Sequence, residues 1–98
     1  MNSKGSAALA EARYQAAEEA FLAGIRQEDG RATMTQLADD VAVEASAWNS
    51  AEYEAMHAAT SPDERTERDH TTERTEVLAS LWVDIARAFR RDTAYRDG

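Results

Sequence analysis

The stretch from Thr60 to Glu76 constrains the architecture of this chain most strongly, because it contains no apolar side chain except Pro62. The residues that follow, 77–85, form the most apolar window of the sequence. A polar run of this length is not expected to face a hydrophobic core. We therefore expect residues 60–76 to form a polar, solvated segment, which is a solvated helix, a flexible connector or a surface for a partner.

Length and composition indicate one small helical domain over residues 1–98. Alanine, glutamate and arginine are abundant and favour helix, and no run of alternating β-branched residues suggests a strand. The chain has no cysteine, which excludes disulfides and thiolate zinc sites. It shows neither the roughly 20 apolar residues of a membrane span nor, at its N-terminus, the apolar core of a secretory signal. A cytoplasmic protein without membrane contact is the expectation.

Capping signals divide the chain into three expected helices, near 7–28, 33–58 and 62–91. Ser6 is a good cap for the first helix, and Gly30 is a suitable terminator. Thr33 begins a Thr-x-x-Gln pattern that fits a capping box for the second helix. The third start is the best one, because Ser61 precedes Pro62 and two acidic residues fall in the first turn.

The second helix carries a further start signal in its middle, since Asn49-Ser50-Ala51-Glu52 also fits a capping box. The second helix could therefore break and restart at Asn49, or it could run through without interruption. Asn and Ser inside a helix cost only about half a kilocalorie per mole each. We favour a continuous or kinked helix because alanines are frequent on both sides of Asn49.

The expected fold is an all-α, small three-helix bundle with a long C-terminal helix. Thirty residues of helix would be about 45 Å long, which is more than a small three-helix core covers. We therefore expect a homodimer or a stable complex with another protein. The apolar stripe of the third helix is the expected core or oligomer face, comprising Val77, Leu78, Leu81, Trp82, Ile85 and Phe89.

Residues 36–48 resemble a helix-turn-helix motif in the spacing of their alanines and large apolar residues. Ala42 stands where that family usually has a glycine in the turn, and the corresponding recognition helix, residues 44–52, contains no Lys or Arg. We favour an ordinary amphipathic helix. A DNA-binding transcriptional regulator is the alternative, with phosphate contacts from Arg87, Arg90, Arg91 and Arg96.

Each of the two histidines follows a glutamate by three residues, in the pairs Glu54/His57 and Glu67/His70. This spacing resembles the ligand pairs of ferritin-like di-iron proteins, in which glutamates from neighbouring helices complete the site. Glu18 and Glu19 would be the additional carboxylates. A metal-binding helical protein is therefore a remote alternative, and the expectation is no metal and no cofactor.

Catalytic patterns are absent from the sequence. It has no glycine-rich phosphate loop, no nucleophile elbow and no cysteine. Only Asp84, between Val83 and Ile85, is a carboxylate in an apolar context, and a carboxylate needs burial or a charged neighbour to gain a working pKa. We expect a protein without enzymatic activity and name no catalytic residue.

The net charge of −8 disfavours nucleic acid as a ligand and suits a partner with a basic surface. The leading hypothesis is a small acidic helical regulator or inhibitor that docks on another protein, one that handles nucleic acid. Small acidic proteins of phage or plasmid origin, including several anti-CRISPR inhibitors, act in this way, although no motif assigns the chain to them. The expected partner-binding residues lie in the polar run: Glu64, Arg65, Glu67, Arg68, Glu73 and Arg74.

Overall fold

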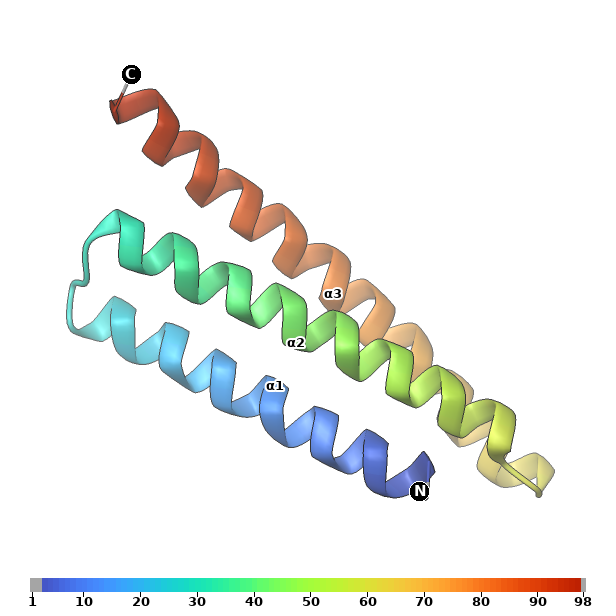
Figure 1. The fold of residues 1–98 in the computed structure, drawn as a ribbon. Helices are drawn as coiled ribbons and strands as arrows, with labels where there is room; N and C mark the ends of the chain where they lie inside the picture. Colours follow the sequence, from blue (N-terminus) through green and yellow to red (C-terminus); the bar gives the residue numbers. More distant parts are fainter. Residues whose placement is uncertain (1–2, 98) are drawn as a thin grey trace.

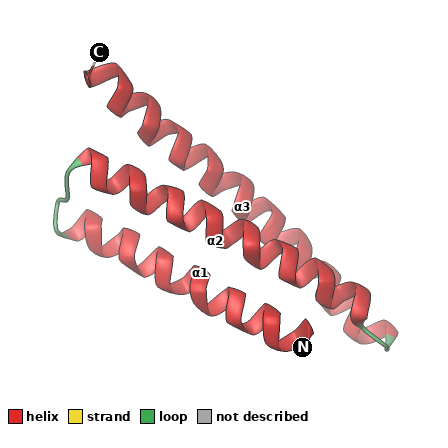
Figure 2. Ribbon diagram, viewed as in Figure 1, coloured by secondary structure: helices red, strands yellow, loops and turns green. Residues whose placement is uncertain are grey.

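The computed structural model describes the backbone of residues 3–97 and the side chains of residues 5–91. It consists of three α-helices, α1 (Ser3–Arg26), α2 (Arg31–Ala58) and α3 (Pro62–Asp97), joined by two short loops (Figures 1 and 2). No strand occurs in residues 3–97. The all-α three-helix fold expected from the sequence is therefore confirmed. Within the same residues, none of the helices has both the length and the apolar character that crossing a membrane requires.

The helices are arranged with α2 between the other two (Figure 1). The α1–α2 and α2–α3 pairs each run antiparallel because the connecting loops are short. At 36 residues, α3 is longer than the 28 residues of α2, so its C-terminal end extends past the start of α2 (Figure 1). The long dimension of the molecule, 53 Å, is close to the length of α3 alone.

Aromatic side chains close the gap between α1 and α3. No Cα atom of the described part of α1 lies within 8 Å of one in α3. Phe21 nevertheless contacts Trp82 edge to face, with ring centroids 5.1 Å apart, and reaches Phe89 at 5.9 Å. On α2 the core residues are small, which lets the neighbouring helices approach closely. Ala38, Val41 and Ala45 are fully buried there. The core is thus tightly packed along α2 and bridged by large rings between α1 and α3.

Two of the three expected helix starts were wrong. The first helix begins at Ser3, ahead of the predicted cap Ser6, and the second begins at Arg31, ahead of Thr33. Gly30 precedes the second helix in an extended conformation and has no side chain to cap it. The third start is confirmed, because Ser61 Oγ accepts a hydrogen bond from the Glu64 backbone N–H at 3.1 Å. The continuous course of α2 through Asn49 is also confirmed.

The turn after α1 uses Glu28 where the sequence pointed to Gly30. Glu28 has a φ of 56°, in the left-handed region, whereas Gly30 has a φ of −64°. The Asp29 N–H donates to the Gly24 carbonyl at 3.0 Å, which is the long bond of a Schellman-type helix end. Gly24 itself lies against α2, since an added Cβ would come within 2.9 Å of both Leu37 Cδ1 and Met34 Sδ. The glycine that matters for packing is therefore inside the helix.

Candidate functional site

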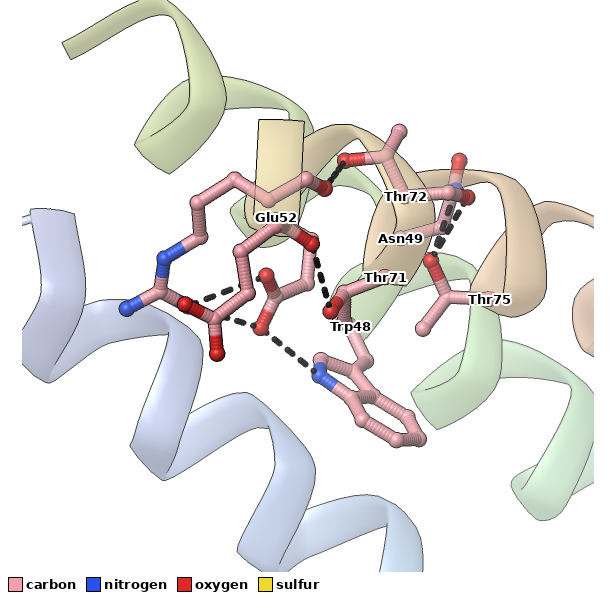
Figure 3. A network of polar contacts seen from close by, with 8 residues as sticks. Trp48, Asn49, Glu52, Thr71, Thr72 and Thr75 are labelled. Atoms are coloured by element: carbon pink, nitrogen blue, oxygen red, sulfur yellow. Dashed lines mark hydrogen bonds and ion pairs between the residues drawn. The ribbon is translucent and has the colours of Figure 1, made fainter. Parts of the chain in front are cut away.

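A polar interface joins the start of α3 to the end of α2. The Asn49 side-chain amide donates to the Thr72 carbonyl oxygen and to Thr75 Oγ1, both at 2.9 Å (Figure 3). Thr75 Oγ1 donates in turn to the Thr72 carbonyl at 3.0 Å. Thr72 and Thr75 are both buried, so the expectation that residues 60–76 form a solvated segment was wrong at these two residues. Threonine hydroxyls can be buried because Asn49 and the backbone replace their water.

A second set of contacts surrounds Glu52, which is 3% exposed. Arg68 Nη1 donates to both carboxylate oxygens, at 3.1 Å to Oε2 and 3.3 Å to Oε1. The Trp48 indole N–H donates to Oε1 at 3.3 Å from the adjacent turn (Figure 3). A carboxylate this deeply buried requires a charged partner and hydrogen-bond donors. Arg68 and Trp48 therefore account for the burial of Glu52.

A cavity of about 340 Å³ lies beside this ion pair, between α1, α2 and α3. It is lined mostly by polar residues, namely Glu11, Trp48, Glu52, Arg68, Thr71, Arg74, Thr75 and Leu78. Every buried side-chain nitrogen or oxygen among the described residues has a hydrogen-bond partner within the chain. We therefore interpret the polar interface as a structural element that fixes how α3 sits on α2.

A hydrogen-bonded chain links α1 and α3 at the aromatic core. Trp82 Nε1 donates to the Tyr14 hydroxyl at 3.1 Å, and that hydroxyl donates to Glu18. The pKa of Tyr14 is raised from 10.0 to about 12, chiefly by burial and also by the hydrogen bond to Glu18 and its charge, while the Trp82 N–H lowers it. Tyr14 also packs on Trp48, with ring centroids 5.2 Å apart. These groups act in packing, since each already has its partner inside the bundle.

The part of α3 that faces away from the bundle carries exposed side chains, large apolar ones among them. We call it the outer face of α3, and all its side chains are exposed. At its middle, Val77 is 70% and Leu81 53% exposed, although both are large apolar residues. A depression of about 410 Å³ lies here, lined by Glu73, Arg74, Val77, Leu78 and Leu81. The outer face comprises Glu67, His70, Arg74, Val77, Leu81, Asp84, Ala88 and Arg91. Arg74 stands at its edge, since it also lines the cavity beside Glu52.

The structure divides the apolar stripe that the sequence assigned to one core or oligomer face. Trp82 is buried, and Leu78, Ile85 and Phe89 are half-buried against the core. Val77 and Leu81 lie outside it. Sequence reasoning missed this division because the stripe is wider than the surface that α1 and α2 cover. The spacing of three and four residues from Glu67 to Arg91 would have separated the two sets.

The six expected partner-binding residues also fall into two groups. Arg68 is engaged with Glu52, and Arg65 Nη2 donates to the Ala59 carbonyl at 3.3 Å. Glu64 is half-buried at the first turn of α3. The other three, Glu67, Glu73 and Arg74, are exposed and lie on or beside the outer face of α3.

The helix-turn-helix interpretation of residues 36–48 is wrong, because α2 runs through them without a turn at Ala42. The C-terminal arginines do gather in part, since Arg87, Arg90 and Arg91 line one depression together with Asp84. Arg90 is held by Asp39 at 2.7 Å. The side chain of Arg96 lies outside the described residues. DNA binding through these arginines stays a prediction, which fluorescence-anisotropy titration at low and moderate salt would test.

The Glu-x-x-His pairs are not brought together. Residues with described side chains form no group of three or more His, Asp or Glu that could hold a metal ion. His57 instead lies edge to face against the Tyr53 ring, with centroids 4.4 Å apart, and His70 is exposed on the outer face of α3.

Comparison of the chain with protein-family models, curated proteins and solved structures gave no match.

Proposed function

We propose that this protein is a non-enzymatic protein-binding module, a small acidic regulator or inhibitor that docks on another protein through the outer face of α3. The observation that carries the proposal is the exposure of Val77 and Leu81, 70% and 53%, whereas the other large apolar residues among the described side chains of α3 are at least half-buried. Protein interfaces commonly have such an apolar centre with a charged rim. Here Glu73, Arg74 and Asp84 provide the rim.

The charge of the chain supports a particular class of partner. The net charge of −8 favours a protein with a basic surface, such as one that handles nucleic acid. Charged residues around an apolar centre mainly raise the association rate and exclude wrong partners, whereas the apolar residues hold the complex together. Glu67 and Glu73 would therefore guide the encounter, and Val77 and Leu81 would set the lifetime of the complex.

A capture experiment with matched variants tests the proposal. The V77S/L81S variant should lose about tenfold to a hundredfold in affinity for proteins that the wild type binds, because each residue gives up about 1 kcal/mol of apolar burial. The L9S/V43S variant is the control, since Leu9 and Val43 are exposed to a similar degree, 53% and 64%, on the other two helices. Equal recovery of partners by wild type and V77S/L81S contradicts the proposal.

The charged rim is tested separately with the E67K/E73K variant. Both glutamates are exposed, so folding should be unchanged within about 0.5 kcal/mol. Association with a basic partner should slow, most strongly at low salt. An association rate that is independent of both the substitutions and the salt concentration contradicts a guiding role for these carboxylates.

A further inference from the structure

The outer face of α3 has the spacing of a coiled-coil seam. Its eight residues recur at alternating intervals of three and four along residues 67–91. This is the heptad pattern that keeps one stripe of a helix facing a neighbouring helix over many turns. All eight are exposed, so neither α1 nor α2 occupies the seam. The two large apolar residues, Val77 and Leu81, stand at its centre.

We propose that this seam pairs with the same seam of a second copy of the chain, with the two α3 helices antiparallel about a two-fold axis level with Ala79. This inference rests on the proposed function in taking the outer face of α3 as a protein-docking surface. In this register Val77 packs against Leu81 of the second copy, and symmetry repeats the contact. Leu78 lies next to Leu78 of the second copy and widens the apolar centre. In the single chain Val77, Leu78 and Leu81 already line one depression.

Charge complementarity along the seam identifies the occupant. One turn outward from the apolar centre, the register places Arg74 opposite Asp84 of the second copy. Near the ends, it places Glu67 opposite Arg91 of the second copy. Both pairs unite opposite charges, and the two-fold axis doubles each of them. Every charged layer of the seam is therefore matched when the partner is another copy in this orientation.

The flank of the seam agrees with the same register. Glu73 and Arg87 are exposed and occupy equivalent positions beside the seam, two heptads apart. In antiparallel pairs, residues at this flanking position face one another across the interface. Glu73 would thus lie near Arg87 of the second copy. This contact uses residues outside the seam and supports the orientation independently.

Other arrangements of the two helices bring like charges together. A parallel pair places Arg74 against Arg74 and Asp84 against Asp84 of the second copy. Sliding the antiparallel pair by one heptad places Glu67 opposite Asp84 in one direction and Arg74 opposite Arg91 in the other. Like charges facing each other oppose association, so the sequence of the seam selects one register.

A charge-swap series tests the pairing by sedimentation velocity. R74D and D84R each create two like-charged layers and should weaken dimerisation at least about tenfold. The double variant R74D/D84R restores opposite charges only in the antiparallel register, and its dimerisation should return to within about threefold of wild type. An equimolar mixture of the two single variants should form a heterodimer. A double variant as weak as the single ones overturns the antiparallel register.

Introduced cysteines give a second readout of the register, because the chain contains no cysteine of its own. His70 lies opposite Ala88 of the second copy in the proposed pair. Mixing H70C with A88C under oxidising conditions should give a disulfide between the two variants, since cysteines on facing positions approach closely. Each variant alone should remain uncrosslinked. Disulfide formation by either variant alone indicates a parallel pair and overturns the proposal.

The failure of this inference can be distinguished from failure of the proposed function. A wild-type chain that remains monomeric up to about 1 mM, the range of very weak association, overturns self-pairing. If V77S/L81S still abolishes capture of a different protein in that case, the outer face of α3 is a docking surface for that protein. If dimers form and capture of other proteins is unaffected by V77S/L81S, the second copy is the partner of this face and regulation of another protein through it is excluded.

Discussion

Arg68 of α3 donates to both carboxylate oxygens of Glu52 in α2, at 3.1 and 3.3 Å, and thereby neutralises a carboxylate that is almost fully buried. The contact lies in the most polar part of the sequence, yet it helps to join two helices. The contact engages Nη1 of Arg68 within the bundle, whereas Arg74, six residues later, is exposed on the outer face of α3.

Removing Arg68 should expose how much the buried carboxylate depends on it. We expect R68M to lower the free energy of unfolding by about 1–3 kcal/mol, because Glu52 keeps only the Trp48 N–H while it remains shielded from water. The expected loss is smaller than for a fully buried ion pair because the Arg68 side chain is 24% exposed. Urea unfolding followed by far-ultraviolet circular dichroism measures the change.

Two further variants separate the ion pair from general effects of losing an arginine. E52Q/R68M should be less destabilised than the sum of E52Q and R68M, with a coupling of about 1 kcal/mol or more. R65M, which removes an exposed arginine of the same segment together with its one hydrogen bond to the Ala59 carbonyl, should cost less than R68M, about 1 kcal/mol at most. Additive effects of E52Q and R68M would show that the two residues act independently.

The architecture was predictable from the sequence because helix propensity and apolar spacing agreed along the whole chain. Residues 36–48 were favoured as an ordinary amphipathic helix, and within them Val41 and Ala45 are fully buried. The polar interface was not predictable, since it depends on which residues α2 places opposite α3. Asn49, read alone, suggested a helix break. Only the fold brings it to Thr72 and Thr75, where its amide replaces water.

The exposure of the outer face of α3 was likewise not predictable from the sequence. Val77 and Leu81 belong to an apolar stripe, and a stripe predicts burial without saying which neighbour supplies it. The width of the surface that α1 and α2 cover decides which residues of the stripe are buried. Because α1 reaches α3 mainly through aromatic rings, it covers Trp82 and part of Phe89 and leaves the far side of the stripe exposed.

The raised pKa of Tyr14 predicts that the folded chain loses stability at high pH. Its pKa is raised from 10.0 to about 12 in the folded chain, chiefly by burial. Below pH 10 the phenol is protonated in both states. As the pH rises from 10 to 12, the unfolded chain loses this proton first, so the free energy of unfolding falls. The stability difference between wild type and Y14F should therefore shrink over this range, as measured by urea unfolding.

Y14F also tests the hydrogen-bonded chain at neutral pH. The substitution leaves the buried Trp82 N–H without its acceptor and removes the bond to Glu18, which should cost about 1–2 kcal/mol. A wild-type-minus-Y14F difference that is constant between pH 9 and about pH 12 would contradict the raised pKa of Tyr14.

Glu28 offers a stabilising substitution. Its φ of 56° lies in the left-handed region, which costs a residue with a Cβ about 1 kcal/mol or more. E28G removes that strain and so stabilises the folded chain. The greater conformational freedom of glycine in the unfolded chain offsets only part of this gain. We expect a net gain of about 0.5–1 kcal/mol in thermal or urea unfolding. Q27G, one residue earlier, is the control and should be neutral or destabilising; equal gains from both would rule out relief of strain at Glu28.

Asn49 provides the most specific test of the polar interface, because its role depends on donating hydrogen bonds. In N49D the amide becomes a carboxylate, which cannot donate to the Thr72 carbonyl and lies close to it. We expect a loss of about 1–3 kcal/mol at neutral pH. S50D introduces the same charge at the adjacent exposed position and should change stability by less than about 0.5 kcal/mol. If N49D were no more destabilising than S50D, the amide bonds to Thr72 and Thr75 would contribute little to joining α2 and α3, and the apolar core alone would set the position of α3.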